Sequence, residues 1–324
     1  MKALFIGGTG VISSACSELA LARGIDLYLL NRGRSVRPVP AGVRVLHADI
    51  RDPEQARAAL AGHAFDVVVD WIAFTPDQVA ADVALFRGRT GQYIFISSAT
   101  VYEKPPSRLP IVEDTPLHNP FWTYAASKIA CEELLREAAR VEGFPSTIVR
   151  PSHTYDRTKL PVTGGYTSVA RMRQGKPVVV QGDGTSTWVL THHRDFAVGL
   201  VGLLGNLRAV GEAFHITSDE LLTWNQVYSI VGRAAGVEPH LVHIPSDVIA
   251  RHDPEWGAAL LGDKAHSVIF DNSKIRRFVP DFAPAIPFTR GVEEIIAWYD
   301  ADSARQTVDA RLDAVQDTLT AQWG

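Results

Sequence analysis

The chain has 324 residues, of which 46% are hydrophobic and 21% are charged, and its formal net charge at pH 7 is −4. This composition fits a globular protein large enough for two lobes. It excludes a disordered chain and a globally basic surface for nucleic acid. No apolar run reaches the length of a membrane span and the first strand follows Met1 directly, so we expect a cytoplasmic protein without a membrane segment. Cys16 and Cys131 lie far apart in the sequence and are expected to be reduced core residues.

The first half of the sequence alternates short apolar runs with stretches of helical spacing. The runs predict strands at Ala3–Gly7, Asp26–Leu30, Val43–His47, Asp66–Asp70, Gln92–Ser97 and Ser146–Arg150. The helical stretches are Gly10–Arg23, Pro53–Gly62, Pro76–Arg87 and Tyr124–Glu142. Repeated strand–helix units predict an α/β fold with a doubly wound parallel Rossmann sheet, with the ligand at the carboxyl ends of the strands.

The regular alternation stops after Pro151, where Pro, Gly and His become frequent. We expect residues 1–155 to form a dinucleotide-binding domain, with elements returning to it near residues 178–217. Residues 156–324 are expected to form mainly a smaller C-terminal substrate-binding lobe. The expected strands are Val178–Val180, Trp188–Thr191 and Ala213–Thr217, the expected helices are Asp195–Leu204, Trp224–Ala235 and Val292–Asp300, and the tail Ala304–Gln322 is amphipathic.

A glycine-rich turn follows the first predicted strand and reads Gly7-Gly8-Thr9-Gly10-Val11-Ile12-Ser13. Glycines in such a turn let the backbone approach a pyrophosphate, which then lies at a helix N-terminus. Ser13 occupies the third position of the usual glycine spacing. The pattern predicts dinucleotide binding, and the backbone positions expected to contact the cofactor are Gly7, Thr9, Gly10, Val11 and Ile12.

The end of the second strand bears on which dinucleotide binds. An NAD site usually carries a carboxylate there for the ribose 2′-hydroxyl, but this chain has Asn31-Arg32-Gly33-Arg34. A guanidinium can instead hold a 2′-phosphate, so Asn31 and Arg32 favour NADP(H), with NAD(H) as the alternative. A solvated basic turn is the other interpretation. Asp49 and Ile50, after the third strand, are placed to meet the adenine.

Tyr124 and Lys128 lie four residues apart on a predicted helix, on the same face. A free tyrosine has a pKa of about 10 and is a poor base at neutral pH. A lysine ammonium one turn away, together with an oxidised nicotinamide, would favour the phenolate, and Lys128 would also hold the nicotinamide ribose. Ser98, at the end of the fifth strand, could then orient the substrate oxygen.

These features together resemble the extended short-chain dehydrogenase/reductase superfamily, in its NAD-dependent epimerase/dehydratase branch. The resemblance extends over nearly the whole chain. It rests on the glycine turn, Asp49-Ile50, Ser97-Ser98-Ala99-Thr100-Val101-Tyr102, Tyr124 with Lys128, Arg150-Pro151, and Gly182-Asp183-Gly184 leading to His192 and Asp195.

The resemblance implies a catalytic trio, carried here by Ser98, Tyr124 and Lys128, and a smaller C-terminal lobe that closes on the substrate. It also implies that Pro151, Ser152 and His153 line the cofactor and substrate cleft. Family members often pair as dimers, so a homodimer is expected. The candidates for substrate contact are Thr100, Trp188, His192 and Lys264.

Departures from the family pattern narrow the chemistry. Sugar-nucleotide dehydratases carry an Asp-Glu pair where this chain has Ala99 and Thr100, so water elimination is rejected. Epimerases acting on nucleotide sugars grip the diphosphate with two arginines. Their places fall here at Trp188 and near Leu261, with Lys264 the closest cation, so the anion clamp is missing or rebuilt.

The sequence therefore predicts an NAD(P)-dependent oxidoreductase or epimerase acting on a secondary alcohol or ketone of a polar, carbohydrate-like substrate. A nucleotide-sugar epimerase with a rebuilt diphosphate site is one alternative. The subgroup resembled also includes chloroplast RNA-binding relatives, so an RNA-binding protein of this fold is another, which the acidic balance disfavours. No metal site is predicted. His192-His193 would point to opposite faces of a strand, and His240-x-x-His243 lacks a carboxylate at ligand spacing.

Overall fold

A computed structural model describes residues 1–324 and contains a central sheet of seven parallel strands. The strands lie in the order β11-β6-β5-β4-β1-β2-β3. Their bounds are β1 Lys2–Ile6, β2 Asp26–Asn31, β3 Arg44–His47, β4 Phe65–Asp70, β5 Thr90–Ile96, β6 Ser146–Pro151 and β11 Ala213–Ile216. The predicted α/β fold with a doubly wound parallel sheet is confirmed.

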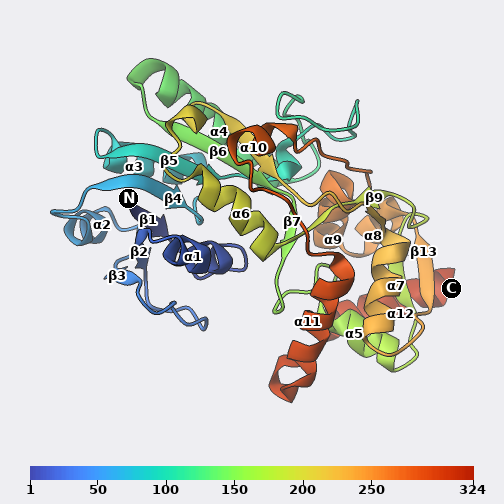
Figure 1. Cartoon of the computed structure of the whole chain (residues 1–324). Helices are drawn as coiled ribbons and strands as arrows, with labels where there is room; N and C mark the ends of the chain where they lie inside the picture. The colour runs from blue at the N-terminus through green and yellow to red at the C-terminus, as the bar shows by residue number, and fades with distance from the viewer.

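Helices cover both faces of this sheet, which explains why its strands are apolar on both sides. One hydrophobic cluster lies between the face of the sheet that carries Phe5 and the helices α1 and α6 (Figure 1). A second hydrophobic cluster lies between the opposite face of the sheet, which carries Leu4, and the helices α2, α3 and α4. The helix bounds are α1 Ser13–Ala22, α2 Pro53–Ala59, α3 Pro76–Phe86, α4 Thr123–Glu142 and α6 His193–Leu203.

The strand order reverses beside β1, because β2 and β3 follow on one side of β1 while β4 and β5 follow on the other. A reversal of this kind leaves a crevice outside the carboxyl ends of the two central strands, where ligands bind in open α/β sheets. The glycine turn follows β1, and the segment from Trp71 follows β4, so both border this crevice.

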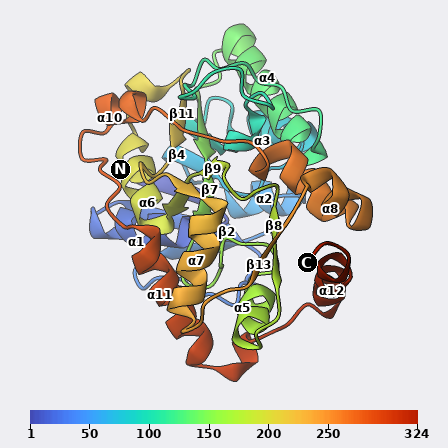
Figure 2. The same cartoon turned by 90° about the vertical axis from the view of Figure 1, so that its right-hand side faces the viewer.

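A second lobe is built from short strand pairs and helices and has its own hydrophobic clusters. Its strands are β7 His153–Tyr155, β8 Val178–Gln181, β9 Thr187–Trp188, β10 Leu190–His192, β12 Leu222–Thr223 and β13 Leu241–Ile244. Its helices are α5 Tyr166–Arg173, α7 Trp224–Ala234, α8 Ser246–His252, α9 Pro254–Ala259, a π-helical turn Leu260–Lys264, α11 Phe288–Asp300 and α12 Ala310–Trp323. Figure 2 shows α12 at the outer edge of this lobe. Short 3₁₀ turns at Ala99–Val101, Leu207–Ala209 and Ser303–Arg305 and the helix α10 Ser273–Phe278 complete the chain.

Several elements differ from the sequence prediction. Strand β8 pairs with β13 inside the second lobe, not with the large sheet. The single strand expected at residues 188–191 is divided into β9 and β10, which have different partners. Within the amphipathic tail the helix begins at Ala310, because the Asp309 side chain accepts a hydrogen bond from the Leu312 N–H and caps it there. Helices α5, α8, α9 and α10 were not predicted, and no helix is long and apolar enough to cross a membrane.

A buried ion pair joins α4 to the sheet. The Arg150 guanidinium on β6 donates to both carboxylate oxygens of Glu132 on α4, at 2.9 and 2.7 Å, and both side chains are at most 1% exposed. The Ser97 hydroxyl at the end of β5 donates to the same carboxylate at 2.6 Å. Glu132 lies two turns after Tyr124, so this pair fixes the helix that carries the predicted catalytic residues.

We predict that Arg150→Met destabilises the protein by about 3 kcal/mol, because the Glu132 carboxylate stays buried without its main partner. Urea unfolding followed by circular dichroism measures the change. Arg140→Met is the matched control, since Arg140 pairs with Glu137 at the exposed end of the same helix and its loss should leave the midpoint nearly unchanged. Equal midpoints for the two variants would contradict the prediction.

Candidate active site

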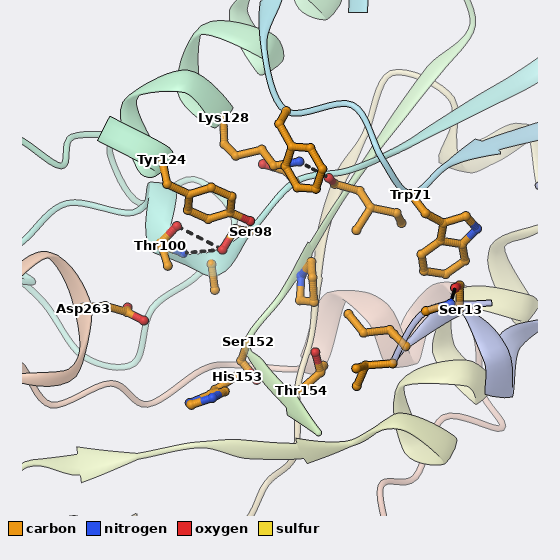
Figure 3. Close-up of a pocket in the computed structure, with 18 of the residues that line it drawn as sticks. Ser13, Trp71, Ser98, Thr100, Tyr124, Lys128, Ser152, His153, Thr154 and Asp263 are labelled. Atoms are coloured by element: carbon orange, nitrogen blue, oxygen red, sulfur yellow. Dashed lines mark hydrogen bonds between the residues drawn. The ribbon is translucent and has the colours of Figure 1, made fainter. Parts of the chain in front are cut away.

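A cavity of about 740 Å³ opens at the carboxyl ends of the central strands, between the sheet and the second lobe. Figure 3 shows part of its lining, with Ser13 and Trp71 at one end and Tyr124 and Asp263 at the other. The sheet side is lined by residues 7–13, Ser35, Trp71, Ile72, Phe74, residues 96–100, Lys104, Trp122, Tyr124, Lys128 and residues 151–154. The second-lobe side is lined by Lys159, Trp188, Val189, Asp263, Lys264, Val268 and Phe270.

The glycine turn has the geometry of a phosphate cradle. Gly7 and Gly8 adopt φ values of 102° and 93°, which side chains rarely allow, and a Cβ on Gly8 would lie 2.4 Å from the Leu29 side chain. No side chain caps the N-terminus of α1. The backbone there is therefore open to an anion, as a dinucleotide pyrophosphate requires. Ser13, which replaces the third glycine, accepts a hydrogen bond from the Gly10 N–H at 2.7 Å and closes the turn.

The residues expected at the adenosine end lie together at neighbouring strand ends but outside the cavity lining. The Asn31 side chain accepts a hydrogen bond from the Gly33 N–H at 2.9 Å and stabilises the turn after β2. The Arg32 side chain is 56% exposed, and its guanidinium lies 3.5 Å from the Asp49 carboxylate. Ile50 is buried in the core below.

Arg37, which the sequence analysis did not single out, crosses from this region to the second lobe. Its guanidinium donates to the Gly10 carbonyl at 3.4 Å and also reaches the side chains of Asp156 and Thr158. The ion pair with Asp156 is largely buried. Arg37 therefore links the glycine turn to the lobe on the far side of the crevice, a link between segments 119 residues apart that only the folded chain reveals.

Ser98, Tyr124 and Lys128 all face the cavity from the ends of β5 and α4. The Lys128 ammonium is buried and donates to the backbone carbonyls of Ala73 at 2.7 Å and Ile96 at 2.8 Å. Two of its three N–H groups are thus used, and one is left for a ligand. The Ser98 oxygen accepts hydrogen bonds from the Thr100 N–H at 3.2 Å and the Thr100 hydroxyl at 3.0 Å (Figure 3). The Ser98 hydrogen is therefore left for another acceptor, and the Tyr124 oxygen is one such partner.

Burial sets the protonation of this group. It raises the pKa of the Tyr124 phenol, a hydrogen bond from Ser98 opposes the rise, and the negative charge of Asp263 adds to it. Burial also lowers the pKa of Lys128 to about 8. The sequence analysis expected Lys128 to favour the phenolate. In the structure the ammonium lies 5.9 Å from the centre of the Tyr124 ring, and burial dominates. The phenol is protonated at pH 7, as a free tyrosine is, and is available as a proton donor.

The remaining predicted residues fall into two groups. Pro151, His153, Thr100, Trp188 and Lys264 line the cavity. Trp188 is only 3% exposed, and its indole N–H donates to His153 Nδ1 at 3.2 Å, so it forms a wall of the cavity as well as part of the core.

His192 does not line the cavity, so its expected contact with the substrate is not reproduced. It ends β10 while His193 begins α6, and their rings lie 4.7 Å apart, so the expectation that they occupy opposite faces of a strand was wrong. The backbone turns between them. No group of three or more His, Cys, Asp or Glu side chains is placed to hold a metal ion.

Among the cavity residues that the sequence analysis missed are Trp71, Phe74, Lys104, Trp122 and Asp263. Trp71 and Phe74 could have been found, because they directly follow β4 and the carboxyl ends of parallel strands border the ligand site. The other three come from loops and a short π-helical turn. No spacing in the sequence connects these three with the predicted catalytic residues.

A parallel doubly wound sheet, a glycine cradle and a large cavity at the strand ends define a dinucleotide-binding protein of the Rossmann class. Residues 3–217 match the model of the NAD dependent epimerase/dehydratase family, so the chain belongs to that family. The resemblance found in the sequence is thereby confirmed.

Relatives within the family differ in their stated roles. The chain is 26% identical over 309 residues to the 2'-dehydrokanamycin reductase of Streptomyces kanamyceticus, covering 92% of this chain and 84% of that protein. It is 27% identical over 261 residues to a chloroplast stem-loop binding protein of 41 kDa of Arabidopsis thaliana, covering 75% of this chain and 65% of that protein. The fold is similar to that of the UDP-glucuronic acid 4-epimerase of Bacillus cereus in complex with NAD, with a TM-score of 0.72, 18% identity, and coverage of 93% and 99% of the two chains.

The buried ammonium of Lys128 generates a prediction about stability and pH. An unfolded lysine keeps its proton to about pH 10.4, whereas Lys128 in the folded chain releases it near pH 8. Between these values the unfolded state binds more protons, so the folded state becomes more stable as the pH rises. We expect the wild type to gain up to about 3 kcal/mol over Lys128→Met between pH 8 and 10.5.

Guanidinium unfolding of both proteins across this range measures the effect. Taking the difference between wild type and Lys128→Met removes the contribution of the other groups that titrate at alkaline pH. A difference that stays constant from pH 8 to 10.5 would show that the Lys128 ammonium is not desolvated.

Proposed function

We propose that the chain is an NAD(P)-dependent oxidoreductase or epimerase that acts on a secondary alcohol or ketone of a polar, carbohydrate-like substrate. The observation that carries the proposal is the convergence of Ser98, Tyr124 and Lys128 on the same cavity as the glycine turn. Membership of the family and relatives named as a reductase and as epimerases support it.

The residues divide the work of carbonyl reduction among them. When bound, the dinucleotide supplies a hydride to the carbonyl carbon. The neutral Tyr124 phenol donates its proton to the carbonyl oxygen, which becomes a hydroxyl. The Ser98 hydroxyl, which also interacts with Tyr124, donates its hydrogen to that oxygen and holds it within reach, because the Ser98 oxygen is already occupied by two hydrogen bonds from Thr100. The remaining N–H of Lys128 is available to the nicotinamide ribose. In the oxidation direction the same groups act in reverse.

Tyr124→Phe keeps the aromatic ring but removes the transferable proton. We expect the rate of hydride transfer to fall by roughly 10²–10⁴-fold, the range for a lost general acid or base, with cofactor affinity almost unchanged. The measurement is the loss of reduced-nicotinamide absorbance with a panel of keto sugars. Thr123→Val, one residue earlier on α4 and outside the cavity lining, is the control. Near-normal turnover of Tyr124→Phe would sink the proposed mechanism.

Net redox chemistry and epimerisation make different demands on the cofactor. An epimerase oxidises and re-reduces one carbon and keeps its dinucleotide, while a reductase exchanges it in every turnover. Mass spectrometry of the purified protein under native conditions separates the two, since retained oxidised cofactor favours an epimerase. A nucleotide-sugar epimerase is the second candidate. It is favoured by the lysines in the cavity, and tight binding of UDP would support it.

For the cofactor, we propose that Arg32 favours NADP(H) over NAD(H). The support is the absence of a carboxylate at the end of β2 and the exposed guanidinium of Arg32. A 2′-phosphate needs cationic, bidentate partners, and Arg32 can provide one. The Asp49 carboxylate at 3.5 Å is the competing partner of this guanidinium.

Replacing Arg32 by Ala should weaken NADP(H) binding by about 1.5–3 kcal/mol, the range for hydrogen bonds to a charged group, and should leave NAD(H) binding unchanged. Titration calorimetry with both cofactors on the wild type, Arg32→Ala and the control Arg34→Ala gives the comparison. If the wild type prefers NAD(H), and Arg32→Ala affects both cofactors alike, then Arg32 is only a solvated turn residue.

A further inference from the structure

Three lysines line the cavity close enough to one another and to Asp263 for their charges to interact, and Figure 3 shows Asp263 at the end away from Ser13. Lys104, Lys159 and Lys264 come from three separate segments, and all of them line the cavity together with Asp263. Lys104 is 99% buried at its side chain and pairs with Asp263 at 3.4 Å. No carboxylate lies within ion-pair distance of Lys159 or Lys264, so one carboxylate faces three ammonium groups.

Neither of the two unpaired lysines has a part in the proposed hydride and proton transfer. The backbone at Lys264 is held in place, because its carbonyl accepts a hydrogen bond from the Trp224 indole N–H at 3.0 Å. Its ammonium lies 5.9 Å from the centre of the Trp122 ring. Burial lowers the pKa of Lys264, and the positive charges of Lys159 and Lys104 lower it further against the effect of Asp263. An anion bound beside Lys264 would relieve this repulsion.

His153 adds a neutral donor to the same end. Its Nδ1 accepts the hydrogen bond of Trp188, which places the ring proton on Nε2. Burial holds the pKa of His153 well below its usual range, and the charges of Lys264 and Lys159 lower it further, so the ring stays neutral. Two ammonium groups and one ring N–H thus line one cavity end. These donors suit a carboxylate or a phosphate.

We propose that the substrate carries an anionic group, a carboxylate or a phosphate, that binds to Lys264 and Lys159 at this end of the cavity while its reacting carbon faces Tyr124. This inference rests on the proposed function for the position of the reacting carbon. The Asp263 carboxylate is neutralised by Lys104 and leaves the pair of lysines free. The cofactor pyrophosphate has its own cradle at Gly7–Ser13, at the opposite end (Figure 3).

The test uses the full chain saturated with oxidised cofactor and three probes of one size class, namely glucose, glucuronate and glucose 6-phosphate. Quenching of tryptophan fluorescence reports binding, because Trp122 and Trp188 line this end. We expect at least one anionic probe to bind roughly 10–100-fold more tightly than glucose. Which of the two anionic probes binds more tightly distinguishes a phosphate from a carboxylate.

Lys264→Met and Lys159→Met should each remove most of this preference, and Lys264→Arg should restore it. Lys176→Met is the matched control, since Lys176 pairs with Asp313 and Asp317 outside the cavity. The dependence on salt is a test that needs no variant, because added NaCl should weaken the binding of the anionic probe to the wild type and leave the binding of glucose unchanged. Equal affinities for glucose and both anionic probes would overturn the inference. The inference would also be overturned if Lys264→Met and Lys159→Met lost as much affinity for the cofactor as for the anionic probe, because these charges would then bind the cofactor.

Failure here is separable from failure of the proposed function. Tyr124→Phe should still bind the anionic probe as the wild type does, because the two lysines act in binding alone. If hydride transfer to neutral keto sugars proceeds and no preference for anionic probes is found, only the proposal of an anion site is contradicted. If a preference for anionic probes is found but Tyr124→Phe leaves hydride transfer unaffected, only the proposed mechanism is contradicted.

Discussion

The buried ammonium of Lys128 is the interaction on which the site depends. It donates to backbone carbonyls of Ala73, beyond the end of β4, and of Ile96, at the end of β5. It also lies 4.6 Å from the centre of the Phe74 ring and 4.7 Å from that of Phe95. An unpaired charge in this position would be strongly unfavourable, so the carbonyls and aromatic faces are needed to keep it there. Their arrangement joins α4 to two adjacent strand ends.

The same helix is anchored a second time, one turn further on. Tyr124, Lys128 and Glu132 follow at intervals of four residues and form one stripe of α4. Glu132 binds Arg150 of β6 and Ser97, which directly follows β5, so the stripe is attached at or beyond the ends of β4, β5 and β6 at successive turns. Because Tyr124 lies at the open end of this stripe, its phenol is positioned by contacts made one and two turns away. This explains how a residue in the first turn of a helix can face a cavity in a defined orientation.

The second lobe decides what the cavity can accept. The sheet side provides the glycine cradle and Tyr124, while Trp188, Asp263 and Lys264 line the other side. Asn119 ties the two sides together, because its amide donates to the carbonyls of Thr100 at 2.8 Å and Gly262 at 2.6 Å. Asp263 is the residue after Gly262. Burial is the main cause of the raised pKa of Tyr124, and the negative charge of Asp263 raises it further. The lobe thus contributes both to the lining of the cavity and to the pKa of Tyr124.

The sequence by itself determined the α/β class and the glycine turn, and it pointed to the stripe on α4. These signals are local, because a strand, a turn and an i,i+4 pair each depend on residues that lie close together in the sequence. It did not determine the partners of β8, the turn between His192 and His193, or the link from Arg37 to Asp156. The charge balance around Asp263 and Lys264 was equally hidden, since Lys104 lies about 160 residues earlier in the chain. Contacts of this kind arise when the second lobe packs over the sheet, and that packing adds to the burial that raises the pKa of Tyr124 and lowers that of Lys264.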